Sequence, residues 1–97
     1  METITLLKSD ILHRNEEGFL SNKLGDEMVM MNLESGDYLG INEVGFVIWD
    51  YLQGPKPVQE ILDFLVSEYD VTPENCESDT MPYLQQLLLQ KVVLVNR

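Results

Sequence analysis

Residues 35–52, SGDYLGINEVGFVIWDYL, decide the fold because they pass from a turn through a short strand directly into a helix. Ser35, Gly36 and Asp37 have turn chemistry, since glycine tolerates a positive φ and aspartate bonds nearby backbone groups. The next segment, Tyr38–Ile41, is predicted to be a strand short enough to sit at a sheet edge. Asn42 is a favoured N-cap residue, so a helix is expected to follow it immediately.

The predicted helix after Asn42 carries a wide apolar stripe made of Val44, Phe46, Val47, Ile48, Trp49, Tyr51 and Leu52. Gly45 is unusual in this setting, because a glycine inside a helix costs about 1 kcal/mol relative to alanine. We therefore expect Gly45 to be needed for close packing against the preceding strand.

Length and composition indicate a single globular domain spanning residues 1–97, with 44% apolar and 24% charged residues. No apolar run is long enough for a membrane span, and the N-terminus lacks the pattern of a secretory signal. Cys76 is the only cysteine, so no internal disulfide is possible. These features predict a protein of the cytoplasm with no membrane partner.

The charge balance is strongly acidic, with six Lys/Arg residues against seventeen Asp/Glu residues and a net charge of −11. Nucleic-acid affinity depends mainly on neutralising phosphates, so a nucleic-acid partner is disfavoured. A basic partner would be attracted in a salt-sensitive way. The alternative is that the acidity only keeps a small protein soluble.

Strands are predicted on both sides of a first turn, over residues 11–14 and 19–24, and the clearest strand covers 27–33. Residues 1–10 show no clear period and are expected to fray or to wrap loosely. Alternation over 27–33 separates Met28 and Met30 from Val29 and Met31 on opposite faces. The turn at 34–37 should return the chain antiparallel into Tyr38–Ile41.

The second half of the chain is predicted to be helical. An unbroken apolar stripe over residues 58–69 predicts the second helix, after Pro55 and Pro57. Pro82 would break a continuous later helix, so the third helix is expected to start at Asp79 or Thr80 and end near Gln90, with 72–75 as a separate or kinked first turn. Its expected inner stripe is Tyr83, Leu84, Leu87, Leu88 and Lys91. Residues 92–95 are predicted to finish as a short strand or an extended tail.

The resulting fold class is α+β and winged helix-turn-helix-like, with an N-terminal three-stranded antiparallel β-sheet followed by three α-helices. The hairpin of residues 27–41 would be the wing.

Enzymatic chemistry is poorly supported by this composition. His13 has no nearby partner in the sequence, and Cys76 is flanked by carboxylates that disfavour a thiolate. No Cys/His cluster has metal-ligand spacing, and no nucleotide-binding motif is present, so no metal and no cofactor are expected. A carrier-protein function would need an Asp-Ser-Leu motif for phosphopantetheine, which the chain lacks. The chain is therefore predicted not to be an enzyme.

Two binding functions remain. A winged helix often binds DNA, but the third helix offers only Lys91 as a cation, while Glu27, Glu34 and Asp37 place negative charge on the wing. An edge strand beside a helix instead suits peptide capture by strand addition. The predicted peptide-binding residues are Asp37, Tyr38, Leu39, Gly40, Ile41, Tyr83, Leu84, Leu87 and Leu88. For the helix residues the alternative is ordinary core packing.

The central stretch resembles the PqqD-like family of precursor-peptide recognition domains, whose run is G-x-Y-[YF]-x-L-N-x-x-G-x-x-I-W-x-x-L. The resemblance covers about Asp26 to Leu94 and includes residues 54–61, 68–71 and the segment from Asp79 to Leu87. Three departures from the family pattern are present, and the first two bear on the preference of the predicted groove. Leu39 and Ile41 stand where Tyr/Phe and Leu are common, Thr80 replaces Val, and Lys91 replaces Gly.

The resemblance implies a non-catalytic protein that binds the leader segment of a ribosomally made precursor peptide and delivers it to a separate processing enzyme. It implies that the leader pairs with Tyr38–Ile41 and packs against the helix over 80–88, which adds Thr80 to the predicted peptide-binding residues. The run Asn42-Glu43-Val44-Gly45 with Ile48-Trp49 looks closest to the partners of lasso-peptide leader peptidases. The alternative is a member that serves a radical SAM enzyme, as in pyrroloquinoline quinone biosynthesis. Since an exposed strand edge can pair with its own copy, a monomer or weak dimer is expected.

Overall fold

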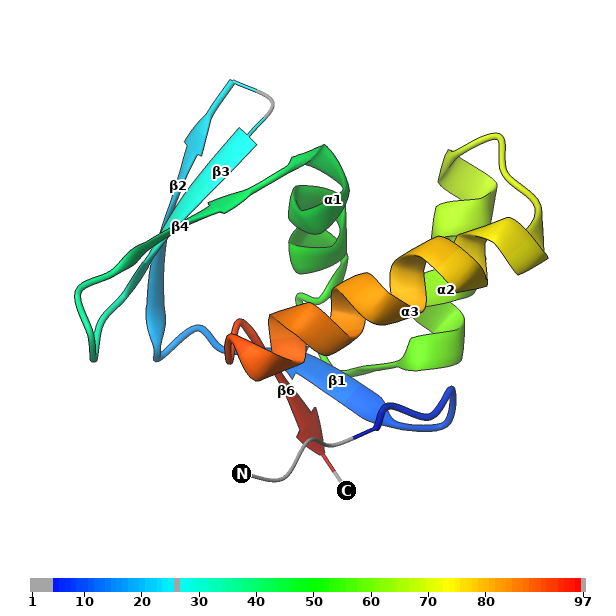
Figure 1. Cartoon of the computed structure of the whole chain (residues 1–97), viewed down its shortest axis with the longest axis horizontal. Coiled ribbons are helices and arrows are strands. Elements are labelled where there is room, and N and C mark those ends of the chain that lie inside the picture. The colour runs from blue at the N-terminus through cyan, green and yellow to red at the C-terminus, as the bar shows by residue number, and fades with distance from the viewer. Residues whose placement is uncertain (1–4, 26, 97) are drawn as a thin grey trace.

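The computed structural model describes residues 5–25 and 27–96, which form six strands and three helices (Figure 1). The expectations for residues 1–4 and for Asp26 in the turn after Gly25 lie outside the described residues. In chain order the elements are β1 (Ile11–Arg14), β2 (Phe19–Leu24), β3 (Glu27–Asn32), β4 (Tyr38–Ile41), α1 (Glu43–Tyr51), β5 (Lys56–Pro57), α2 (Val58–Glu68), α3 (Pro73–Leu89) and β6 (Val93–Asn96). The fold is thus a small α+β domain with three helices and antiparallel sheets.

The first sheet is an antiparallel meander in the order β2-β3-β4. Its hairpin pairs Met28 with Ile41 and Met31 with Tyr38, which confirms the predicted return of the chain. Met28 and Met30 are buried, whereas Val29 and Met31 on the opposite face are half-buried. The strand β3 is therefore one-sided, as the alternation predicted, although it ends one residue earlier than the expected Leu33.

A second sheet was not anticipated. β1 lies between β5 and β6 and pairs antiparallel with both, so that Leu12 faces Lys56 on one side and Val95 on the other. This sheet joins the start, the middle and the end of the chain. The predicted C-terminal strand is confirmed, and its partner is the equally short strand β1.

Residues 5–10 are held to the domain at two buried positions although the other four are exposed, so the expected fraying is not seen in this part of the segment. Leu6 and Asp10 are buried, and the Leu6 N–H donates to Oε1 of Gln85 at 3.1 Å. The carbonyls of Asp10 and Lys8 accept from the N–H groups of Val58 and Gln59 at 2.9 and 3.0 Å. These N–H groups begin α2 and have no acceptor within the helix, so the N-terminal segment replaces the cap that Pro57 cannot supply.

The predicted starts of α1 and α2 are confirmed. Asn42 caps α1, since its Oδ1 accepts from the Gly45 N–H at 2.9 Å. The helix α2 starts at Val58 and buries the predicted stripe through Val58, Ile61, Leu62 and Leu65.

The expected start of the third helix at Asp79 or Thr80 was wrong, because α3 is one helix from Pro73 to Leu89 with Pro82 inside it. Thr72 caps the helix, with Oγ1 accepting from Asn75 N–H at 3.1 Å, and proline follows at the first helical position. The extra turns bury Cys76 and Thr80. We attribute the continuous helix to this strong start signal and to the burial, which together outweigh the hydrogen bond that Pro82 removes.

Lys91 does not belong to the inner stripe of α3. It is exposed and follows the helix in the left-handed region, with φ of 64°. The Val92 N–H donates to the Leu87 carbonyl and the Lys91 N–H to the Leu88 carbonyl, both at 3.0 Å. This is the Schellman ending that glycine usually serves.

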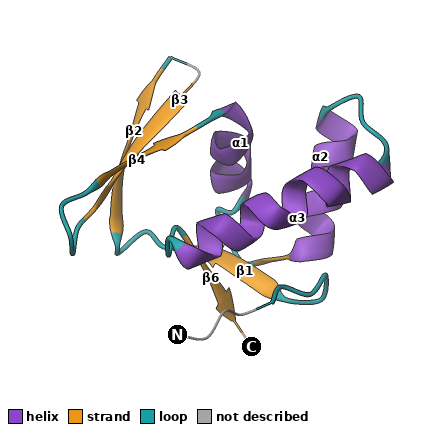
Figure 2. Ribbon diagram, viewed as in Figure 1, coloured by secondary structure: helices purple, strands orange, loops and turns teal. Residues whose placement is uncertain are grey.

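One hydrophobic core connects the two sheets through the helices (Figure 2). Met30 and Ile41 enter it from the meander, and Leu12 and Val93 enter it from the second sheet. α1 contacts β3 and β4, while α3 contacts α2 and β6. The arrangement brings the C-terminal end of β4 close to α3, although about forty residues separate them in sequence, as Asn42 and Tyr83 show.

Candidate functional site

The outer edge of β4 is unpaired within residues 5–25 and 27–96. The Asn32 N–H donates to the Asp37 carbonyl at 2.8 Å, and these two residues are opposite in the hairpin register. Since bonded and non-bonded pairs alternate along an antiparallel ladder, the backbone groups of Leu39 and Ile41 point to β3. Those of Tyr38 and Gly40 point outward, where a further strand can bond them.

Gly45 lies where β4, α1 and α3 come into contact, and this contact region is called the joint below. A Cβ atom at this position would collide with Oη of Tyr83 and Cγ2 of Ile41. The expected close packing against the preceding strand is confirmed, and the structure adds Tyr83 as the second neighbour.

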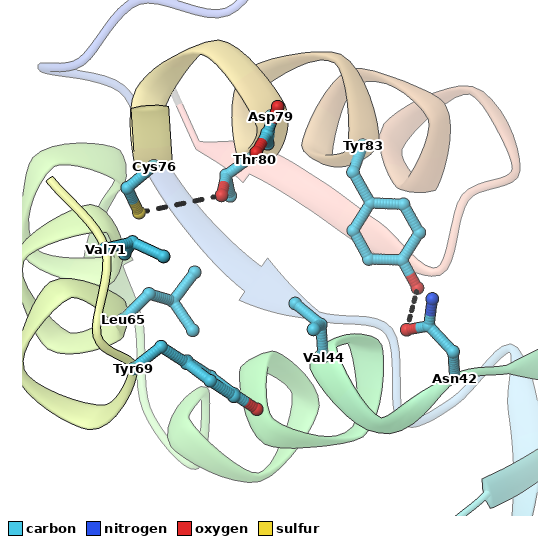
Figure 3. A pocket seen from close by; sticks show the side chains of 9 residues that line it. All are labelled: Asn42, Val44, Leu65, Tyr69, Val71, Cys76, Asp79, Thr80 and Tyr83. Atoms are coloured by element: carbon cyan, nitrogen blue, oxygen red, sulfur yellow. Dashed lines mark hydrogen bonds between the residues drawn. The ribbon is translucent and has the colours of Figure 1, made fainter. Parts of the chain in front are cut away.

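Tyr83 links α3 to the end of β4. Its hydroxyl donates to Oδ1 of Asn42 at 3.4 Å, the oxygen that also caps α1 (Figure 3). The side chain is half-buried, and this burial raises the pKa of Tyr83 above its ordinary value. The neutral hydroxyl therefore persists through the physiological range as a donor at this joint.

A cavity of about 400 Å³ opens beside this joint, among the start of α1, the end of α2 and the first half of α3 (Figure 3). Its walls are mainly apolar, and polar groups come from α3, from Asn42 and from Tyr69 at the end of α2. The lining residues are Asn42, Val44, Leu65, Tyr69, Val71, Cys76, Asp79, Thr80 and Tyr83.

The electrostatic environment of the cavity is negative. Burial raises the pKa of Tyr69, and the carboxylates of Glu43 and Glu68 raise it further. Asp79 contributes a third carboxylate, and no lysine or arginine among residues 5–25 and 27–96 lines the cavity. A cation is therefore favoured at its mouth and an anion is disfavoured.

The ten predicted site residues fall into different environments. Asp37, Tyr38 and Gly40 are exposed at the edge, and Thr80 and Tyr83 line the cavity. Leu39 and Leu88 are half-buried against the core, whereas Ile41, Leu84 and Leu87 are at most 4% exposed. The fully buried leucines of α3 thus have the core packing that was left as the alternative.

Sequence reasoning missed several cavity residues, chiefly Tyr69, Val71 and Val44. In the sequence, Tyr69 is the last residue of the apolar stripe over 58–69 and Val44 belongs to the stripe after Asn42, and both patterns indicate core packing. The only usable signal was Asn42, which was identified as a cap but lies where strand, helix and cavity meet.

Reactive side chains show no catalytic grouping in the described part of the chain. Cys76 is buried, with Sγ 3.7 Å from both the Leu62 carbonyl and Oγ1 of Thr80. Within residues 5–25 and 27–96, no group of three or more His, Cys, Asp and Glu side chains is placed to hold a metal ion.

A second hollow of about 460 Å³ lies on the outer face of the meander, away from the core. Its apolar residues are largely exposed, including Leu20, Leu24 and Tyr38 at 58%, 59% and 75%. The backbone groups of Tyr38 therefore lie on the open edge of β4, and its ring lines the hollow on the outer face.

Comparisons with known proteins identify the family and a similar fold. Residues 27–93 match the family model described as coenzyme PQQ synthesis protein D (PqqD). The solved structure of TbiB1 in complex with the TbiA(β) leader peptide aligns with a TM-score of 0.72 and 30% sequence identity, covering 84% of this chain and 93% of that one. No functionally curated protein matches the sequence.

None of the helices in the described ranges is long and apolar enough to cross a membrane. The family match covers more than half of the chain and includes β3, β4 and all three helices. Members of the family are non-catalytic proteins that bind peptides. The chain belongs to the PqqD family.

Proposed function

We propose that this protein captures the leader segment of a ribosomally synthesised precursor peptide by strand addition to β4 and delivers it to a separate processing enzyme. The observation that carries the proposal is the outward-facing backbone of Tyr38 and Gly40, beside the cavity lined by Tyr83. Backbone bonds at such an edge supply affinity, and side-chain pockets supply specificity. TbiB1, the similar protein, was solved with a leader peptide bound.

The proposed contacts divide into two groups. Residues 37–41 form the pairing edge, while Thr80, Tyr83 and Leu88 form the helical wall. Leu84 and Leu87 support that wall from beneath, because both are buried in the core.

We infer that a lasso-peptide leader peptidase is the enzyme served, because residues 42–49 resemble the partners of such peptidases. A radical SAM enzyme, as in pyrroloquinoline quinone biosynthesis, is the second candidate, and the family description supports it. In either case the enzyme would process the precursor more efficiently because its effective concentration is higher. Tethering a substrate near its enzyme raises overall affinity without new contacts at the active site.

A winged-helix DNA-binding function is the competing reading of the fold. The net charge of −11 works against it, since phosphate neutralisation dominates affinity for DNA. Salt-dependent binding to generic duplex DNA in a gel-shift assay would favour this function over peptide capture.

The edge geometry defines a sharp test, in which binders are first selected from a randomised peptide display library. The Tyr38→Pro variant removes one outward N–H, at the first residue of an edge strand, where proline is tolerated. We expect about a tenfold or greater loss of affinity for the selected peptides, because the backbone hydrogen bond of residue 38 is lost and the proline ring obstructs the added strand. Fluorescence polarisation measures the affinity, and a thermal melt verifies the fold.

Tyr38→Val is the matched control, because it removes the same ring and keeps the N–H. It should bind within about twofold of the unmodified protein, which is less than 0.5 kcal/mol. If Tyr38→Pro binds the selected peptides as well as Tyr38→Val does, strand addition at β4 is wrong.

A further inference from the structure

We propose that the cavity between α1, α2 and α3 binds the side chain of a lysine or arginine that lies just N-terminal to the strand-forming segment of the leader peptide. This inference rests on the proposed function and specifies the peptide that the site prefers.

The position of the cavity fixes which end of the peptide reaches it. β4 runs from Tyr38 to Ile41, and Asn42, the next residue, lines the cavity. A peptide that adds antiparallel to β4 places its N-terminal end opposite the C-terminal end of that strand. The residue that enters the cavity therefore precedes the residues that bond Tyr38 and Gly40.

The walls of the cavity suit a long aliphatic stem. Leu65, Val71 and Val44 project into it from three different segments (Figure 3). A volume of about 400 Å³ is large enough for a long side chain. Lysine and arginine bury their methylene stems against apolar surface while the charged end stays near polar groups.

The charges around the cavity favour a cationic end. Asp79 lines the cavity, and Glu43 and Glu68 act on the Tyr69 hydroxyl that also lines it. In the described residues none of these three carboxylates forms an ion pair, because the two ion pairs are Lys8–Glu77 and Arg14–Glu16. A neutral apolar side chain in the cavity would reduce the hydration of Asp79 without compensating it. A basic side chain supplies the missing charge.

The test uses peptides selected from a randomised display library on the unmodified protein. We expect those that lose affinity for Tyr38→Pro to share a lysine or arginine N-terminal to an alternating apolar segment. Replacing that residue by methionine, which keeps the stem without the charge, should weaken binding about tenfold. A neutralised variant carries Glu43→Gln, Glu68→Gln and Asp79→Asn.

On the neutralised variant the unmodified peptide should also bind about tenfold more weakly, and the methionine exchange should then change little. A control variant removes the same number of negative charges from exposed positions that neither line the cavity nor act on Tyr69, and it should lose less than about twofold. The control substitutions are Glu17→Gln, Asp50→Asn and Glu60→Gln. Urea unfolding verifies each variant, and Asp79→Asn alone replaces the neutralised variant if that protein is unfolded.

The outcomes separate the two proposals. Selected peptides that respond to Tyr38→Pro but share no basic residue at this position, or show no coupling to the three carboxylates, overturn the cavity assignment and leave leader capture intact. Equal losses on the neutralised and control variants also overturn it, since net charge alone would then explain the effect. Peptides that do not respond to Tyr38→Pro reject strand addition, and the cavity assignment fails with it.

Discussion

Gly45 of α1 lies against β4 and α3, and the absence of a side chain lets these three elements pack closely. The Gly45→Ala exchange should raise helix propensity by about 1 kcal/mol, yet the new methyl would displace the Tyr83 ring and the Ile41 side chain. Overpacking of this kind costs about 1–3 kcal/mol. We expect a net loss on the order of 1 kcal/mol in the free energy of unfolding, measured by urea denaturation.

Gly54→Ala is the control for this exchange. Nothing lies within 4 Å of a Cβ atom built at Gly54, and its φ is not in the left-handed region. Its stability should stay within about 0.5 kcal/mol of the unmodified protein. If Gly45→Ala is as stable as Gly54→Ala, the joint is looser than its geometry indicates.

At the scale of elements, the C-terminal end of α3 is where this chain departs from the optimal residue. Lys91 has φ of 64°, and the left-handed region costs an L-residue about 1–2 kcal/mol. Lys91→Gly should therefore raise the free energy of unfolding by about 1 kcal/mol, since the Schellman hydrogen bonds of Lys91 and Val92 remain possible.

Lys91→Ala separates the conformational effect from the loss of the lysine side chain. It retains the Cβ atom and the strain, so it should differ little from the unmodified protein in urea denaturation. Equal stability of the glycine and alanine variants would show that the left-handed conformation carries no penalty here.

The elements that sequence predicted well are those specified by neighbouring residues. The β3–β4 hairpin, the Asn42 cap and the stripe of α2 all follow from local spacing. The second sheet was missed because β1, β5 and β6 are short and pair only through long-range contacts. The start of α3 was missed because the local rule for Pro82 ignores the burial that Cys76 and Thr80 gain in the folded chain.

At the scale of the whole molecule, the sequence predicted that the β4 segment belongs to the candidate site. It did not predict which backbone groups of this segment face outward, or the cavity next to it. Alternation could not tell which backbone groups of residues 38–41 face outward, because that depends on the pairing register with β3. The cavity was missed because Asn42, Tyr69 and Tyr83 come from three distant segments. The packing of α2 against α3 brings Tyr69 and Tyr83 to the same region, and the hydrogen bond from Tyr83 to Asn42 joins the start of α1 to them.

The acidity of the whole chain predicts opposite effects of salt on folding and on binding. The net charge of −11 weakens the folded state, because the carboxylates repel one another. The two ion pairs among the described residues compensate little, since each has at least one strongly exposed partner. Raising NaCl from about 0.01 to 0.1 M shortens the screening length from about 30 to about 10 Å, so the urea midpoint should rise.

Over the same range of NaCl, the affinity for a basic leader peptide should fall, because the attraction that steers it is screened by the same ions. The control variant with Glu17→Gln, Asp50→Asn and Glu60→Gln should show a smaller rise in urea midpoint and a nearly unchanged slope of affinity against salt. A midpoint that is flat or falls with salt would show that these carboxylates do not repel one another appreciably in the folded protein. A peptide affinity that rises with salt would show that apolar burial, and not charge, dominates capture at the β4 edge.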